Sequence, residues 1–171
     1  MTEPAKEAPA SGMPKPSSIS LDNCNPAKRR ELFERIAARS LATLDEGFPG
    51  PIALRPRDLL AVESVEPTSD TLAVCEQTLQ WLWDEGFFRS PNGLIISGTG
   101  EMMQNIHPVA TLTAKGLNAL NANIEVGGER GRAGKLLTEQ LSESGKDARA
   151  AMISEIVGRI ISAAVKGFLG H

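Results

Sequence analysis

The stretch from Gly128 to Lys135 contains the residue types that come closest to a catalytic motif in this chain. In a phosphate-binding loop of the form G-x-x-x-x-G-K-[ST], backbone N–H groups surround the phosphates and the Ser or Thr holds Mg²⁺. Here Glu129 stands where the first glycine is required, and Leu136 replaces the Ser or Thr. The spacing therefore excludes this kind of nucleotide site and favours a flexible glycine-rich hinge over residues 125–134.

The other residues that could catalyse a reaction or bind a metal are scattered along the chain. His107 and His171 are the only histidines, and neither has a second ligand at helical or loop spacing. The adjacent carboxylates of Asp84 and Glu85 point to different sides of a helix, so they make a poor acid–base pair. No serine lies in a G-x-S-x-G elbow. We therefore expect a non-enzymatic protein with no cofactor and no metal.

The composition fits one domain with appendages. The chain has 171 residues, of which 41% are hydrophobic and only 4% aromatic, so part of it is expected to lie outside a core. Cys24 and Cys75 lie far apart and have no C-x-x-C partner, which favours a reducing compartment. No apolar run reaches the roughly 20 residues that cross a bilayer, and the N-terminus lacks a signal-peptide pattern. These features predict a cytoplasmic location.

Helix-start signals divide the first part of the chain into elements. Residues 1–20 are rich in Pro, Ala, Ser and Glu, and are expected to form a disordered leader. Asn25 and Pro26 are a typical cap and first residue of a helix, and an apolar helical period continues to about Glu46. Pro56 begins a second, shorter helix.

The most strand-like part of the chain follows a third helix. Ser69 or Asp70 is expected to cap this helix, which ends at Gly86 because glycine accepts the left-handed conformation. Thr113 caps a further helix. Strands are expected at residues 52–54, 87–89, 94–96 and 109–112.

This order of helix, short strand, two helices, hairpin and helix resembles a winged helix-turn-helix domain over about residues 26–122. The likeness is greatest to the wing region of MarR-type regulators, which has a leucine-rich helix, an E-G-aromatic strand start, a hairpin and an L-T-x-x-G helix entry. The matching segments here are Leu79 and Leu82, Glu85-Gly86-Phe87, and Leu112-Thr113-Ala114-Lys115-Gly116. The resemblance implies a mainly α fold with a small β-hairpin or sheet, and a regulatory function through DNA or protein contacts.

The distribution of charge argues against DNA as the partner. Residues 22–124 hold 9 Lys and Arg against 13 Asp and Glu, whereas residues 126–171 hold 7 against 5. MarR-type wings carry a basic residue near the hairpin tip, but residues 90–111 contain no Lys or Arg. If the domain does bind DNA, the residues expected to read it are Thr71, Gln77 and Arg89.

The final helix, expected from about Asp147 to Phe168, has a broad apolar face that something must cover. This face could fold back onto its own domain, pair with a second copy of the chain, or lie on a membrane surface. We predict self-association. The residues expected to form the contact are Ile153, Ile156, Val157, Ile160, Ile161, Ala164, Val165 and Phe168.

The whole sequence thus predicts a mainly α chain in four parts. These are a disordered leader (1–20), a winged-helix-like domain (21–124), a glycine-rich hinge (125–134) and a C-terminal helical region for oligomerisation (135–171). The expected function is regulation or scaffolding through protein contacts. A DNA-binding transcription regulator dimerised by the last helix is the alternative, and membrane-surface attachment is a third, less favoured interpretation.

Overall fold

Helices dominate this computed structural model, which describes residues 25–91, 109–142 and 146–169, with the side chains of the last helix described over 150–165. The helices are α1 (Pro26–Glu46), α2 (Pro56–Val62), α3 (Ser69–Asp84), α4 (Ala114–Asn121), α5 (Ala133–Ser142) and α6 (Lys146–Leu169). The strands are β1 (Ile52–Ala53), β2 (Phe88–Arg89), β3 (Val109–Leu112), β4 (Asn123–Val126) and β5 (Glu129–Arg132). The prediction of a mainly α fold with a small sheet is confirmed.

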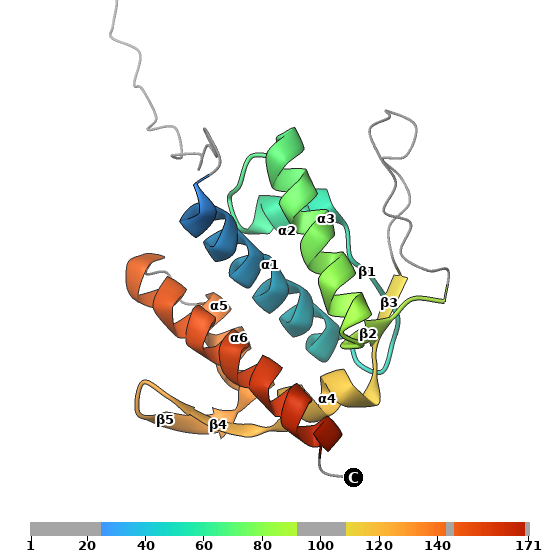
Figure 1. Ribbon diagram of the computed structural model, residues 1–171, viewed down its shortest axis with the longest axis vertical. Coiled ribbons are helices and arrows are strands. Elements are labelled where there is room, and N and C mark those ends of the chain that lie inside the picture. The colour runs from blue at the N-terminus through green and yellow to red at the C-terminus, as the bar shows by residue number, and fades with distance from the viewer. Residues whose placement is uncertain (1–24, 92–108, 143–145, 170–171) are drawn as a thin grey trace, which may run out of the picture.

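Helix α1 is the element around which the others pack. The Asn25 side chain accepts a hydrogen bond from the Ala27 N–H at 3.0 Å, and Pro26 occupies the first helical position, as the sequence predicted. Helices α2, α3, α5 and α6 all contact α1 (Figure 1). Its buried residues, which include Ile36 and Leu41, therefore lie at the centre of the hydrophobic core.

Three short antiparallel strands form a sheet in the order β1–β3–β2. Ile52 pairs with Ala110 in β3, and Phe88 pairs with Leu112. Residues 92–108, which connect β2 to β3, lie outside the described residues. They include His107 and the strand predicted at residues 94–96. The sheet therefore joins the segment after α1 to the two segments that flank this connection.

The E-G-aromatic and L-T-x-x-G segments meet where α3 leads into the sheet. Gly86 has a φ of 71°, which allows the chain to leave α3 at a position where a Cβ is disfavoured. The Thr113 hydroxyl accepts the Gly116 N–H at 3.1 Å and so caps α4. A Cβ on Gly116 would overlap the carbonyl oxygen of Phe87, so the second glycine is required for α4 to pack this closely.

The prediction of a glycine-rich hinge over residues 125–134 is wrong. Strands β4 and β5 form an antiparallel hairpin, in which Ile124 pairs with Gly131 and Glu125 with Arg130. Gly127 and Gly128 make the two-residue turn, with φ values of 60° and 86°. Helix α5 begins directly after β5, so this segment is regular structure and leaves no free linker before the C-terminal region.

Helix α6 folds back onto the rest of the chain. It lies beside α1 and also contacts α4, α5 and β4 (Figure 1). Ile153, Ile156 and Ile160 are fully or almost fully buried, and they belong to the same hydrophobic cluster as the buried residues of α1. The C-terminal region therefore shares one core with α1 and is not an appendage to the rest of the chain.

Candidate functional site

Helix α3 presents one face to solvent while the other is fixed in the core. Its buried face packs on α1 and α2, and it includes Val74, Cys75, Leu79 and Leu82. The residues on the opposite side of α3 follow one another at helical spacing, and each of them is exposed or half-buried. We call this side the α3 outer face: Ser69, Asp70, Ala73, Glu76, Gln77, Gln80 and Asp84.

The α3 outer face combines carboxylates with amides. Asp70, Glu76 and Asp84 supply negative charge, and the Gln80 amide donates a hydrogen bond to Asp84 at 2.8 Å. The sequence of α3 from Ser69 to Asp84 contains no Lys or Arg. This surface can accept hydrogen bonds and attract cations, but it has no group that neutralises a phosphate.

The turn from α2 into α3 is held by a buried ion-pair triad. The Glu63 carboxylate, with a side chain only 1% exposed, lies between Arg35 at 2.9 Å and Arg39 at 2.8 Å, both of α1. Arg35 also donates to the Glu63 carbonyl oxygen at 2.6 Å. The following residue, Ser64, has a φ of 56°, a conformation that costs energy for a residue with a Cβ. The triad therefore ties the C-cap of α2 to α1, just before the segment that leads into α3.

The structure does not bring the three predicted DNA-reading residues together. Thr71 is fully buried: its hydroxyl accepts the Thr68 N–H at 2.8 Å and donates to the Glu66 carbonyl at 2.6 Å. It is part of the capping box of α3, in which Thr68 is the N-cap in place of the predicted Ser69 or Asp70. The prediction that Thr71 reads bases is wrong, because a buried hydroxyl with these partners cannot reach a base edge.

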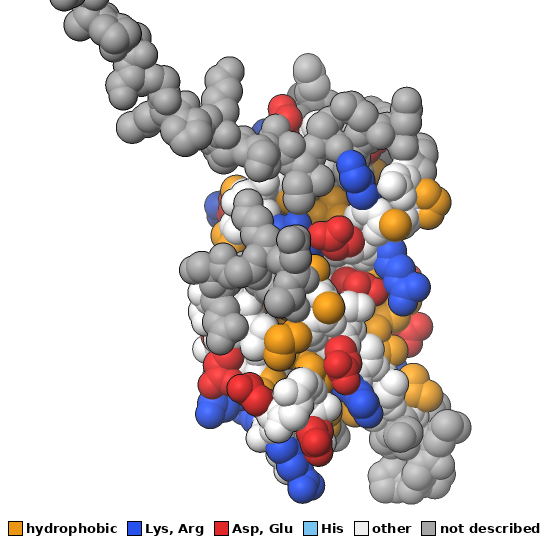
Figure 2. Space-filling model, turned by 90° about the vertical axis from the view of Figure 1, so that its left-hand side faces the viewer, with side chains coloured by type: hydrophobic (Ala, Val, Ile, Leu, Met, Phe, Trp, Pro, Cys, Tyr) orange, Lys and Arg blue, Asp and Glu red, His pale blue; other side chains and the backbone are white. Residues whose placement is uncertain are grey.

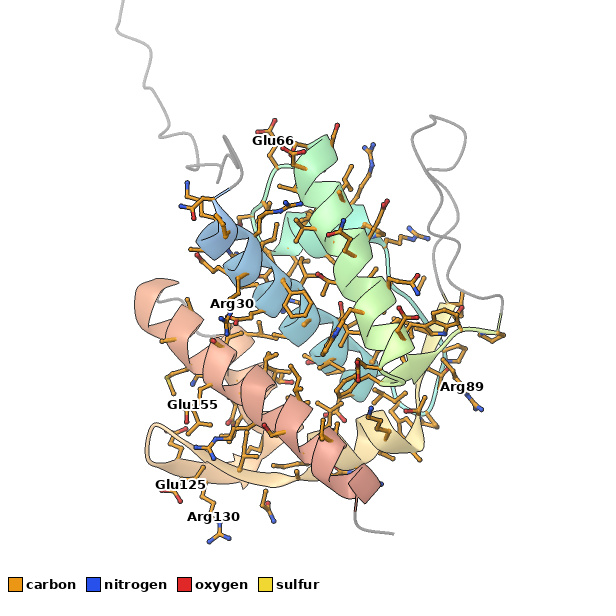
Figure 3. All side chains as sticks on the ribbon, in the orientation of Figure 1. Arg30, Glu66, Arg89, Glu125, Arg130 and Glu155 are labelled. Carbon is orange, nitrogen blue, oxygen red and sulfur yellow. The ribbon has the colours of Figure 1, made fainter. Side chains whose placement is uncertain are left out.

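Gln77 and Arg89 remain accessible on separate elements. Gln77 is exposed on α3, as a reading residue would have to be. Arg89 is exposed on β2, an edge strand, and its side chain points away from the molecule (Figure 3).

The residues predicted to mediate oligomerisation separate into a buried and an accessible group. Five of the eight are buried within the chain, namely Ile153, Ile156, Val157, Ile160 and Ala164. Ile161 is half-buried, Val165 is 49% exposed, and the side chain of Phe168 is outside the described residues. The prediction that the buried five contact another chain is wrong, because α1, α4 and α5 already cover them.

The β4–β5 hairpin is a surface that sequence analysis missed. Glu125 and Arg130 are paired across it and point outward from the molecule (Figure 3). Arg132 is bound to Asp45 at the end of α1. The alternation of exposed Glu125 with buried Ile124 and Val126, followed by a Gly-Gly pair, is the signal that could have identified it.

On one other face of the molecule, the described charges of the two signs are interspersed. On the face seen from the side of α6 and the hairpin, Lys and Arg side chains alternate with Asp and Glu (Figure 2). Oppositely charged side chains also pair along α5 and α6, where Lys135 lies 3.5 Å from Glu139 and Arg159 lies 3.5 Å from Glu155. The described residues on the face in Figure 2 therefore offer no basic footprint for a nucleic acid.

Reactive groups are few in the part of the chain that the structure describes. Burial, with a smaller contribution from the Glu76 carboxylate, raises the pKa of the Cys75 thiol to about 12, so this thiol stays protonated and is a poor nucleophile. No group of three or more His, Cys, Asp or Glu residues within the described ranges could hold a metal ion. Among the described helices, none is long and apolar enough to cross a membrane.

Comparison with known proteins adds no relative to this description. No family model, no curated protein and no solved structure matches the chain. The function proposed below therefore rests on the surfaces of the chain itself.

Proposed function

We propose that this chain is a non-enzymatic winged-helix interaction protein of the cytoplasm that contacts a protein partner through the α3 outer face. The element order α1–β1–α2–α3–β2–β3 and the sheet order β1–β3–β2 support a winged-helix topology. In that topology, α3 takes the place of the helix that winged-helix regulators present to DNA. The chemistry of its outer face then determines which kind of partner it binds.

The absence of Lys and Arg from α3 is the observation that carries the proposal. A DNA duplex carries closely spaced phosphates. Most of the non-specific affinity of a protein for DNA comes from Lys and Arg side chains that neutralise these phosphates. Asp70, Glu76 and Asp84 would repel those phosphates. The same carboxylates, with the amides of Gln77 and Gln80, suit a protein surface that offers Lys, Arg or N–H donors.

Fluorescence anisotropy with a labelled duplex tests the DNA side of this proposal. We expect no binding by the full chain even at low salt, where phosphate contacts are strongest. A variant with Asp70→Lys, Glu76→Lys and Asp84→Lys is expected to gain weak binding that salt abolishes. Tight binding by the unchanged chain, with an affinity that falls steeply as salt rises, would overturn the proposal.

Site-specific photo-crosslinking tests the protein side. A photoreactive residue replaces Gln77 at the centre of the α3 outer face, and a matched control replaces exposed Lys135 on α5. We expect a discrete protein adduct from position 77 in the cells that express the chain, and its loss when Asp70 and Asp84 are changed to Asn. Equal adducts from both positions would show that α3 is not the contact surface.

The alternative is a DNA-binding transcription regulator, favoured by the exposure of Gln77 and by Arg89 on the edge strand of the sheet. In that case Arg89→Ala weakens binding to all duplexes by a similar factor, whereas Gln77→Ala changes the preference between sequences. The anisotropy measurement distinguishes this alternative from the first proposal.

We also propose self-association through the exposed side of α6, which differs from the buried face predicted for it. Val165 is an exposed large apolar residue there, and half-buried Ile161 lies four residues earlier, on the same face of the helix. Gly158 is exposed within the helix, and a Cβ at this position would meet nothing within 4 Å, so the monomer has no need of a glycine that costs about 1 kcal/mol relative to Ala. A partner helix approaching closely would account for it.

Light scattering coupled to size exclusion tests this second proposal. The full chain is expected to elute as a dimer and Val165→Glu as a folded monomer, while the control Lys135→Glu stays dimeric. A monomeric full chain at every concentration examined would remove self-association from the proposed function and leave the α3 surface unaffected.

A further inference from the structure

We draw no further inference here: the strongest candidate, the half-buried aromatic pair of Phe33 on α1 and Trp81 on α3, whose ring centroids lie 5.3 Å apart, is an apolar surface for which nothing in the structure shows what covers it.

Discussion

Glu63 is a carboxylate that the fold removes from water and surrounds with two guanidinium groups. Its oxygens lie 3.0 Å from Arg35 Nε and 2.8 Å from Arg39 Nε. Replacing Glu63 by Gln leaves two partly buried arginines without their counter-charge. Because breaking a buried ion pair from one side is strongly destabilising, we expect Glu63→Gln to lower the free energy of unfolding by about 3 kcal/mol, measured by urea denaturation.

The surface pair of Arg30 and Glu34 provides the matched control for this substitution. It has a similar separation of 3.0 Å, but the Arg30 side chain is 81% exposed. Glu34→Gln is therefore expected to cost less than about 1 kcal/mol. Equal losses for the two variants would mean that the Glu63 triad contributes nothing beyond an ordinary surface pair.

The buried thiol of Cys75 makes stability depend on pH in the alkaline range. The pKa of Cys75 is raised from 9.0 to about 12 by burial and by Glu76, so above pH 9.0 the folded chain holds a proton that the unfolded chain releases. The stabilisation is complete below pH 9.0, and is lost as pH rises from 9.0 to about 12, by up to about 1.4 kcal/mol per pH unit.

Urea unfolding of the chain and of Cys75→Ala across this range isolates the effect. The chain has no tyrosine, and Cys24 is retained in both proteins, so the difference between the two curves reports Cys75. We expect Cys75→Ala to be less stable at neutral pH, because it leaves a cavity, and the gap to narrow as pH rises. A gap that stays constant up to pH 11 would mean that the folded thiol titrates normally.

The β4–β5 hairpin depends on a turn in which glycine has a conformational role only. Gly128 has a φ of 86°, and a Cβ there would meet nothing within 4 Å. Gly128→Ala therefore costs backbone strain without a steric clash, which we expect to lower the free energy of unfolding by about 1 kcal/mol. Gly128→Asn is expected to cost less, because Asn tolerates the left-handed region.

Gly158 is the control for this substitution, because it also has free space around it but lies within a helix. Gly158→Ala is expected to raise the free energy of unfolding by about 0.5 to 1 kcal/mol in the monomer. Thermal and urea denaturation of the two variants give the signs. If Gly128→Ala also raised the free energy of unfolding, the turn geometry of the hairpin would not be a determinant of stability.

At the scale of elements, the sequence predicted the helix caps, which depend on a few neighbouring residues. It did not predict the β4–β5 hairpin, because its glycines also fit a flexible linker. The Asn25–Pro26 cap and the Thr113 cap are local hydrogen-bonding patterns, and both are found in the structure. The Gly127–Gly128 pair is also local, but the nearby Gly131 and Gly134 made the whole segment resemble a linker. Gly134 lies in α5, where a Cβ would press on the Asp45 carboxylate and require that side chain to shift.

At the candidate site, too, the local sequence allowed more than one structure. Three consecutive polar residues, Thr68, Ser69 and Asp70, can each cap a helix, and the choice of Thr68 places Thr71 in the capping box and removes it from the surface. Gln77 and Arg89, the other two residues predicted to read DNA, are both exposed in the structure. Helical periodicity predicts which residues are exposed. It does not predict which of several polar residues has its side chain in the helix cap.

At the scale of the whole molecule, the apolar stripe of α6 must be buried against another surface, but the sequence did not specify which surface. Periodicity gives the width of the stripe and carries no information on whether the cover comes from the same chain or from another. In the structure, α1 at the start of the chain supplies part of that cover. Buried residues of α1 and of α6, from Ile153 to Ala164, thus belong to one core although more than half the sequence separates the two helices.

This joint core predicts that the chain folds as one unit. Ile160 is fully buried, whereas Val165, five residues further along the same helix, is 49% exposed. We expect Ile160→Ala to lower the free energy of unfolding by about 3 kcal/mol and Val165→Ala to change it by less than about 0.5 kcal/mol. Urea denaturation at a concentration where the chain is monomeric measures both.

Truncation after Ile124 is a more severe test of the prediction that the chain folds as one unit. The shortened chain loses α5 and α6, which cover one side of α1 and include Leu137, Ile153 and Ile160. It would expose a large apolar surface, so we expect it to aggregate or to lack cooperative thermal unfolding and near-ultraviolet circular dichroism. A truncated chain that stays monomeric and unfolds cooperatively would show that residues 25–124 form an independent domain, and would restore a C-terminal region free to bind elsewhere.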